Sequence, residues 1–243
     1  MSRFFAPKEN VKGNLIYIDG QEARHILNAM RLKENDKVVV FDGTGKEYNG
    51  FIKIAQPKSL TVEIVTIKSP KKEALPDITL AQAIPKKNKM ENIIEKATEL
   101  GVSTIIPIIS ERTIVQIGKE KENKKRIRWE NIAGAAAKQC GRVDIPKIEN
   151  IQKFSESIHE LDRYDLSLMA HLSDKTIDLK NAISSFIGGK IIIFIGPEGD
   201  FTPREIALLR DTNCKFVSLG KRVLKSDTAG IYVLSILNYE LAK

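Results

Sequence analysis

Two short loops, each between a predicted strand and a predicted helix, hold the residues best suited to binding a ligand. Residues 196–199, Gly-Pro-Glu-Gly, follow an apolar run at 191–195, and Gly220 opens a basic loop after the strand 216–219. A short run of buried β-formers is typical of a parallel strand, and loops at the carboxyl ends of parallel strands bind ligands in α/β proteins. We therefore expect the two loops to form one active site.

Glu198 decides which ligand the first loop suits. Glycines let backbone N–H groups approach an anion at a helix N-terminus, so the loop has the backbone for a phosphate site. The sequence contains neither GxGxxG nor GxxxxGK[ST], which disfavours a dinucleotide site or a P-loop. Because a carboxylate repels phosphate, the loop fits a cationic or hydrogen-bond-donating ligand better. The alternative is an ordinary tight turn with Glu198 in solvent.

Basic residues gather near the N-terminus and in the loop after the predicted strand 78–84, which ends at the same sheet edge as the glycine loops. Lysine and arginine contact nucleic-acid phosphates whatever the base sequence. A further run at 119–128 is either an RNA contact or a solvated helix face. The predicted RNA-binding residues from this pattern are Arg3, Arg24, His25, Arg31, Lys86, Lys87 and Lys89.

Three other kinds of reactive side chain give weaker signals. His171 follows the predicted strand 166–170 at the ligand edge, but no Ser or Cys nucleophile lies near it, so no catalytic triad is predicted. Arg142 follows a long predicted helix with no obvious acidic neighbour, and substrate binding and a plain surface position are equally open. Cys140 and Cys214 show no disulfide or zinc spacing, so no metal site is predicted.

The first elements along the chain indicate a small β-barrel over residues 1–70. Strands dominate there, with one helix predicted over 20–30 and a hairpin turn at 42–45. Residues 71–76 lie in a stretch flanked by prolines, and this composition predicts a linker. The predicted strands are 3–5, 15–18, 37–42, 48–55 and 60–67.

Residues 77–243 alternate strands with helices, which predicts βαβ units and a parallel sheet. Thr202, Pro203 and Glu205 form an N-cap, a first-turn proline and a capping-box acid, so a helix should begin at Pro203. Ser226 is predicted to cap the last helix. The other predicted strands are 78–84, 104–109, 145–148 and 166–170, and the other predicted helices are 88–100, 120–140, 152–161 and 176–187.

Composition narrows the class of protein. The 243 residues are 42% hydrophobic, enough for one large or two ordinary domains. The net charge of +8 favours a polyanionic partner such as nucleic acid, although a generally basic enzyme has the same balance. The N-terminus lacks the apolar core of a signal peptide, and no run approaches the roughly 18 apolar residues of a membrane span. We expect a soluble, cytoplasmic protein with no membrane partner.

Several blocks of the sequence, in order, resemble the ribosomal RNA small subunit methyltransferase E family. The likeness covers nearly the whole chain, and consecutive blocks in one order are more specific than a single glycine loop. The matching blocks are 95–102 (EKATELGV), 110–113 (SERT), 136–142 (AAKQCGR), 195–199 (IGPEG), 219–225 (LGKRVLK) and 227–229 (DTA).

This resemblance implies a SPOUT-type α/β domain with a trefoil knot, preceded by a PUA-like RNA-binding barrel. It also implies a homodimer that uses S-adenosylmethionine to methylate N3 of a uridine in small-subunit ribosomal RNA, either free or in the assembled subunit. Arg112, in a matching block, joins the RNA-binding candidates. The implied cofactor-binding residues are His171, Leu172, Gly196, Pro197, Glu198, Gly199, Leu219, Gly220, Val223, Leu224 and Thr228.

The chain departs from the family pattern at three places near the site. Asp200 stands where a second glycine is usual, Lys225 where arginine is usual, and Asp227 where glutamate is usual. A non-glycine residue narrows the backbone choices of a turn, so Asp200 bears on the geometry of the loop. The other two exchanges keep the charge and change its reach.

Methylation of uracil N3 requires loss of its proton, and hence a base or a cation that stabilises the anion. Arg142 is the first candidate for stabilising the anion or anchoring a phosphate, and Glu198 is the weaker candidate for a base. A non-catalytic, RNA-binding ribosome-assembly factor is the alternative. A nucleotide-dependent oxidoreductase is disfavoured by the missing dinucleotide fingerprint.

Overall fold

The structure is a computed structural model that describes residues 3–69, 75–173 and 175–242. Its chain divides into two compact units, one made of Met1–Lys72 with Gly134–Ile145 and the other of Glu73–Ala133 with Pro146–Lys243. Most of the predicted linker 71–76 lies outside the described residues. Over the described ranges, every helix is too short or too polar to cross a lipid bilayer.

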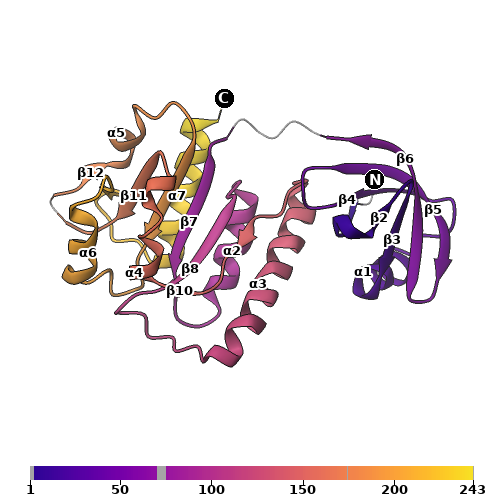
Figure 1. Ribbon diagram of the computed structural model, residues 1–243, viewed down its shortest axis with the longest axis horizontal. Coiled ribbons are helices and arrows are strands. Elements are labelled where there is room, and N and C mark those ends of the chain that lie inside the picture. Colours follow the sequence, from indigo (N-terminus) through magenta and orange to yellow (C-terminus); the bar gives the residue numbers. More distant parts are fainter. Residues whose placement is uncertain (1–2, 70–74, 174, 243) are drawn as a thin grey trace. The chain divides into compact units, whose positions relative to one another are not determined.

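The first unit contains a six-stranded sheet (Figure 1). One cluster of buried apolar residues packs against this sheet. The strands lie in the order β1-β4-β5-β6-β3-β2, and every neighbouring pair is antiparallel except β1 and β4. Its strands are β1 (Arg3–Phe5), β2 (Val11–Lys12), β3 (Leu15–Asp19), β4 (Lys37–Phe41), β5 (Glu47–Gln56) and β6 (Ser59–Lys68). All five strands predicted for residues 1–70 are therefore confirmed, with small shifts at their ends.

One helical segment packs on this sheet, as predicted for residues 20–30. It begins as α1 (Gly20–Arg24), and its last turns widen into a π-helix at His25–Ala29. Ala23 and Ile26 are fully buried in the apolar cluster with Ile16 and Val62 of the strands. The apolar periodicity thus predicted the helix but did not predict its wider, π-helical turns.

The predicted hairpin turn at 42–45 is confirmed between β4 and β5, where Asp42 organises it. Its carboxylate accepts the N–H of Thr44 at 2.8 Å and the hydroxyl of Tyr48 at 2.9 Å. Burial alone would raise the pKa of Asp42, but the hydrogen bonds from Thr44 and Tyr48 outweigh it and lower the pKa below 3.8. Burial, helped by Asp42, raises the pKa of Tyr48 to about 12.

The second unit is a parallel sheet, in which every strand pair runs in the same direction. The order is β10-β8-β7-β13-β11-β14-β12, with β9 also beside β8. Its strands are β7 (Asp77–Ala83), β8 (Thr104–Ile109), β9 (Lys147–Ile148), β10 (Gln152–Lys153), β11 (Leu166–Ala170), β12 (Ile177–Asp178), β13 (Lys190–Ile195) and β14 (Lys215–Ser218). The predicted α/β fold is confirmed, and the trefoil knot stays a prediction.

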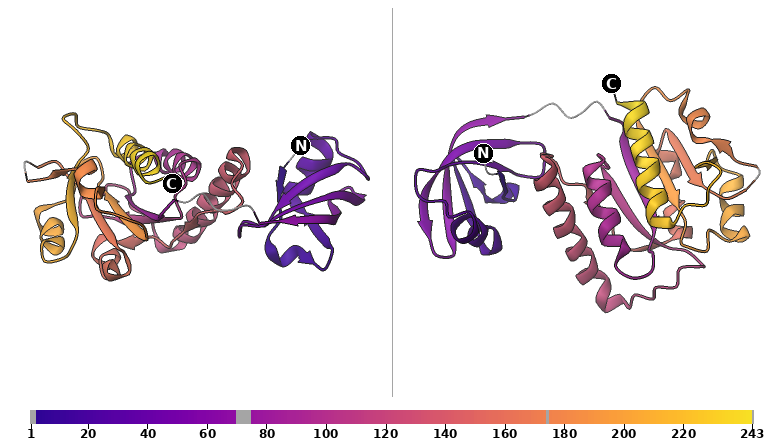
Figure 2. Two further views of the ribbon diagram at one scale, coloured as in Figure 1. Left: turned by 90° about the horizontal axis from the view of Figure 1, so that it is seen from above. Right: turned by 180° about the vertical axis from the view of Figure 1, so that it is seen from behind.

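Helices cover both faces of this sheet. Along β13, Ile192 and Phe194 pack against α4 and α6, whereas the alternate residues face α7. In Figure 2, α2 and α7 lie side by side over one face, and α4 and α6 lie over the other. The helices are α2 (Lys89–Glu99), α3 (Lys119–Cys140), α4 (Phe154–Ser157), α5 (Leu179–Ile183), α6 (Pro203–Arg210) and α7 (Ser226–Leu241).

Two helix predictions were wrong in extent. Of the predicted helix 152–161, only α4 is α-helical, because Gln152 and Lys153 pair with β8 as β10. Of the predicted helix 176–187, α5 is the helical part, because Ile177 and Asp178 pair with β14 as β12. In both cases a place at a sheet edge overrides the local helical pattern.

Candidate functional site

Three loops meet at the carboxyl edge of the parallel sheet and enclose a cavity of ≈ 230 Å³. Two are the predicted glycine loops after β13 and β14, and the third follows β11, which lies between those two strands in the sheet. The two glycine loops therefore line one cavity, as expected, and its role as the active site stays a prediction. The cavity is lined by residues 170–172, 195–198, 200, 219–220, 222–226 and 229.

Glycine is favoured at two positions around this cavity for different reasons. Gly220 has φ +108°, a backbone conformation that residues with a Cβ rarely adopt. A Cβ on Gly196 would lie 3.1 Å from Oδ1 of Asp200 and 3.2 Å from the ring of Phe201. Gly220 therefore lets the chain reverse direction, and Gly196 allows its loop to fold closely onto Asp200 and Phe201.

The predicted start of α6 at Pro203 is confirmed, together with its capping box. Thr202 Oγ1 accepts the N–H of Glu205, and the Glu205 carboxylate accepts the N–H of Thr202 at 2.8 Å. The same buried carboxylate accepts the N–H of Glu111 from the loop after β8, at 2.9 Å. The cap therefore holds two loops of the carboxyl edge together.

Ser226 was wrongly predicted as the N-cap of α7. Lys225 occupies the cap position, and Ser226 is the first helical residue. The Ser226 hydroxyl donates to the Gly196 carbonyl at 2.6 Å and accepts from Nε2 of Gln82, a fully buried side chain of β7, at 2.9 Å. The serine thus fastens α7 to the first glycine loop.

Glu198 lies at the exposed margin of the cavity. Its Oε1 accepts the backbone N–H of Lys86 at 3.1 Å, so the loop after β7 also reaches the site. Lys86 and Lys87 are exposed there, and Lys89 forms an ion pair with Asp227 of α7 at 3.0 Å. The predicted basic loop therefore does adjoin the glycine loops.

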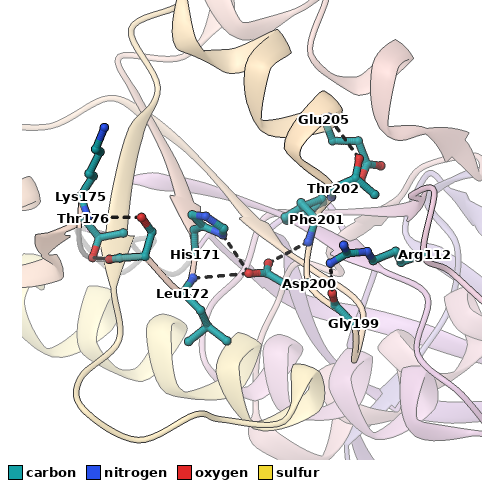
Figure 3. Close-up of polar contacts among 11 residues, drawn as sticks. Arg112, His171, Leu172, Lys175, Thr176, Gly199, Asp200, Phe201, Thr202 and Glu205 are labelled. Carbon is teal, nitrogen blue, oxygen red and sulfur yellow. Dashed lines mark hydrogen bonds and ion pairs between the residues drawn. The ribbon is translucent and has the colours of Figure 1, made fainter.

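Asp200 was noted as a departure from the family pattern, but its contact with His171 was not predicted. Its φ is +58°, and its Oδ2 lies 2.8 Å from Nδ1 of His171 and 3.4 Å from the N of Leu172 (Figure 3). Its Oδ1 accepts the N–H of Phe201 at 2.8 Å. The aspartate in place of the family's usual glycine was the signal in the sequence that could have identified this residue. The contact itself could not be predicted, because His171 lies 29 residues away in the sequence.

The cavity has apolar walls and charged margins. Leu219, Val223 and Leu224 supply apolar surface, and Val223 is 74% exposed, which is unusual for a valine. Arg222 and Lys225 lie on the same loop and also line the cavity. Such a cavity can hold a flat apolar group and, beside the carboxylates of Glu198 and Asp200, a cationic one.

Most of the implied cofactor-binding residues line this cavity, and two do not. Gly199 lies beside it, with its carbonyl accepting Nη1 of Arg112 at 2.6 Å. Thr228 is exposed on α7. The implied residues that do line it are His171, Leu172, Gly196, Pro197, Glu198, Leu219, Gly220, Val223 and Leu224.

The remaining predicted residues belong to the first unit. Arg24, His25 and Arg31 are exposed there. Arg3 is engaged inside the unit, because its Nη2 donates to the carbonyl of Arg142 at 2.9 Å and its guanidinium lies over the ring of Phe41.

Arg142 also belongs to the first unit, where its Nη2 lies 3.1 Å from Oδ2 of Asp144. The statement that Arg142 has no acidic neighbour was therefore wrong. Asp144 stands two residues further along the chain, where it also bridges to Gly43 and Thr44 of the β4–β5 turn.

Comparisons with known proteins identify the family. The model of the RNA methyltransferase domain matches residues 71–238, and the model of the RNA methyltransferase PUA domain matches residues 18–65. Ribosomal RNA small subunit methyltransferase E from Aquifex aeolicus is 31% identical over 94% of this chain and 96% of its own length. This chain belongs to the ribosomal RNA small subunit methyltransferase E family.

Solved members and neighbours of this methyltransferase family share the whole fold. Ribosomal RNA small subunit methyltransferase E from Neisseria gonorrhoeae, solved with S-adenosylmethionine bound, is 28% identical and superimposes with a TM-score of 0.86 over 99% of this chain and 98% of its own. A Legionella pneumophila protein in complex with S-adenosylmethionine is 32% identical, with a TM-score of 0.89 over 98% of this chain and 97% of its own. The predicted PUA-like and methyltransferase domains are thereby confirmed as the fold class.

Proposed function

We propose that this protein transfers a methyl group from S-adenosylmethionine to N3 of a uridine in small-subunit ribosomal RNA. The observation that carries the proposal is the cavity formed by the loops after β11, β13 and β14. Its mixture of apolar walls and two carboxylates matches the two ends of this cofactor, and family members of the same fold are named as ribosomal RNA methyltransferases.

The residues present fit the cofactor chemically. Leu219, Val223 and Leu224 offer apolar surface for an adenine ring, with backbone groups of the same loop as hydrogen-bond partners. The carboxylates of Glu198 and Asp200 suit the positively charged sulfonium and amino groups. A phosphate-binding loop would not suit these groups. When bound, S-adenosylmethionine supplies an electrophilic methyl group on a sulfonium sulfur.

The substrate is RNA, either free or in the assembled small subunit, and the protein acts on it in the cytoplasm. The net charge of +8 supports a polyanionic partner. In this proposal residues 1–70 bind RNA through exposed side chains such as Arg24, His25 and Arg31. Residues 77–243 carry the transfer, with Lys86, Lys87 and Arg112 as the RNA contacts beside the cavity.

Two further features of the family resemblance belong to this proposal. The chain is proposed to act as a homodimer, and the loops that build the cavity are proposed to be threaded into a trefoil knot. Positioning of the acceptor base against the methyl group then supplies much of the rate. Base flipping brings a uracil out of an RNA helix for such positioning.

Arg142 remains the proposed stabiliser of the uracil anion or of a neighbouring phosphate. Its guanidinium is held by an ion pair with Asp144, which fixes its direction. The test is Arg142→Ala, assayed for methyl transfer and, by calorimetry, for cofactor binding. Reduced transfer with unchanged cofactor affinity supports the role, and transfer near that of the wild type excludes it.

A non-catalytic ribosome-assembly factor is the second candidate, because Asp200 stands in the cofactor loop where the family usually has glycine. Titration calorimetry with S-adenosylmethionine, combined with radiolabelled methyl incorporation into small-subunit RNA, separates the two. Cofactor binding together with incorporation supports the methyltransferase. RNA binding without cofactor binding supports the assembly factor and ends the main proposal.

A further inference from the structure

A second cavity, of ≈ 680 Å³, adjoins the proposed cofactor cavity. The two cavities share His171, Leu172 and Asp200, which form the wall between them. The lining of the second cavity also includes the aromatic residue Phe216 and the cationic side chains of Arg112 and Arg210. Aromatic surface and cations together suit a nucleobase with its phosphate.

His171 is held in one orientation within the shared wall. Its Nδ1 lies 2.8 Å from Oδ2 of Asp200, and the edge of its ring meets Phe216 at 6.3 Å between centroids. The side chains of His171 and Asp200 are 16% and 22% exposed, so the pair is shielded but reachable. Figure 3 shows the imidazole directed at the carboxylate.

The hydrogen bond assigns the tautomer of His171. A carboxylate accepts, so the proton of a neutral imidazole belongs on Nδ1 and the lone pair on Nε2. In the part of the chain that the structure describes, Nε2 has no hydrogen-bond partner, and it is not among the buried unpaired atoms. The free lone pair of His171 is therefore accessible to a ligand.

Asp200 adopts a backbone conformation that seldom suits a residue with a side chain. Its φ of +58° lies in the left-handed region, which costs free energy for any residue other than glycine, though less for Asp and Asn than for most. Its carboxylate bonds His171, Leu172 and Phe201 at once. A strained residue beside a ligand cavity whose side chain orients a histidine is the arrangement expected of a functional constraint.

We propose that Nε2 of His171 is the base that removes the N3 proton of the acceptor uracil, which enters from the second cavity, and that Asp200 positions this histidine. The inference rests on the proposed function, because it names the base for that reaction. Glu198 is the poorer base, since it lines only the first cavity and its Oε1 is already engaged by the N–H of Lys86.

The step balances without a further reactant. As the N3–H bond breaks, its proton moves to Nε2 of His171 and its electron pair forms the N3–CH₃ bond. The electrons of the broken S–CH₃ bond stay on sulfur as a neutral thioether. The carboxylate of Asp200 stabilises the imidazolium that results, in the way an aspartate supports the histidine of a hydrolase triad.

The first test compares His171→Ala with a matched histidine control, His159→Ala, which lies on the exposed surface away from both cavities. Single-turnover methyl transfer to small-subunit RNA should fall by roughly 10²–10⁴ in His171→Ala. The rate is measured at a concentration of S-adenosylmethionine that saturates each variant, as determined by calorimetry, so that an effect of His171 on cofactor binding is separated from the chemical step, and added imidazole should restore part of the rate. Transfer by His171→Ala within about threefold of the wild type would overturn the assignment.

The second test asks whether Asp200 positions His171, and its spectroscopic part needs no activity. Asp200→Gly relieves the positive φ but also removes the acceptor of three hydrogen bonds, so its melting temperature reports the balance of the two effects, whereas transfer should fall at least about tenfold. In ¹⁵N spectra of the cofactor-free protein, His171 should carry its proton on Nδ1 in the wild type and lose this preference in Asp200→Gly. A wild-type proton on Nε2, or full transfer by Asp200→Gly, contradicts the positioning role.

The two levels of the proposal fail in different ways. If His171→Ala methylates the RNA as fast as the wild type does, His171 is not the base, and the proposed function still stands. A wild-type protein that transfers no methyl group to RNA under any of these conditions excludes both.

Discussion

The hydroxyl of Ser226 lies 2.6 Å from the carbonyl oxygen of Gly196, and this bond joins the first turn of α7 to the loop after β13. The same hydroxyl accepts from Gln82, whose Nε2 also donates to the carbonyl of Ala83 at 3.0 Å. The chain of bonds thus runs from the buried strand β7 to the wall of the cofactor cavity. It fastens the first glycine loop to the start of α7, which directly follows the second glycine loop.

Ser226→Ala should therefore lower both stability and cofactor affinity. The substitution leaves the carbonyl of Gly196 without its side-chain donor and deprives the buried amide of Gln82 of an acceptor, which costs about 1–3 kcal/mol. Thermal unfolding and titration with S-adenosylmethionine measure the two effects. Ser235→Ala, at an exposed site of the same helix, is the control and should change stability by less than about 0.5 kcal/mol. Equal effects of the two variants would show that the chain of bonds is unimportant.

Glu198→Gln should weaken binding of S-adenosylmethionine more than binding of S-adenosylhomocysteine. The amide can still accept the N–H of Lys86, so the loop keeps its contact and loses only a charge. Because Glu198 is exposed, solvent limits the effect to about 1 kcal/mol, or roughly fivefold in affinity for the sulfonium form. Calorimetry with both ligands is the measurement. An equal loss for both would mean that the carboxylate does not act on the sulfonium charge.

The exposed lysines after β7 should contribute to RNA affinity without sequence preference. Replacing Lys86 and Lys87 by alanine should weaken RNA binding and reduce the slope of log affinity against log salt by roughly one unit or more. Lys190→Ala is the matched control, because this exposed lysine begins β13 at the opposite edge of the sheet. A double variant whose salt slope equals that of the control would exclude contact between this loop and the phosphates.

The β4–β5 turn should make stability depend on pH at both ends of the scale. The pKa of Asp42 is lowered on folding, so its contribution is present above pH 3.8 and is lost as the pH falls through the lower folded value. The pKa of Tyr48 is raised to about 12, so its contribution is full below pH 10 and is lost as the pH rises toward 12. Denaturant unfolding across pH should show both losses in the wild type.

Asp42→Asn should reduce the acid loss more than Asp19→Asn, which changes an exposed carboxylate of the same unit. The variant should also be less stable near neutral pH by about 1–3 kcal/mol, because a buried charged hydrogen-bond acceptor is removed from Thr44 and Tyr48. An unchanged acid profile in Asp42→Asn would place the acid sensitivity elsewhere in the protein.

Local signals in the sequence predicted much of the fold. The strand 166–170 and the start of α6 at Pro203 were predicted to the residue, because a buried apolar run and a capping box depend on neighbours in the chain. The helix predicted over 152–161 was wrong in extent because Gln152 and Lys153 follow the edge of β8, and no local pattern records that edge.

The candidate site, too, could be predicted from the sequence only in part. The two glycine loops could be predicted, since each is a short motif after a strand. The pair of His171 and Asp200 could not, because it depends on β11 lying between β13 and β14 in the sheet. Ser226 was wrongly predicted as an N-cap for the same reason, since its acceptor, the carbonyl of Gly196, belongs to the loop after another strand.

The central claim, that this protein methylates one uridine of small-subunit ribosomal RNA at N3, is tested most directly by mass mapping of that RNA. Cells with the gene for this chain deleted are compared with cells in which the gene is restored. The proposed function predicts that a single N3-methyluridine disappears on deletion and returns on restoration. A methylation pattern that is identical in the two would contradict it.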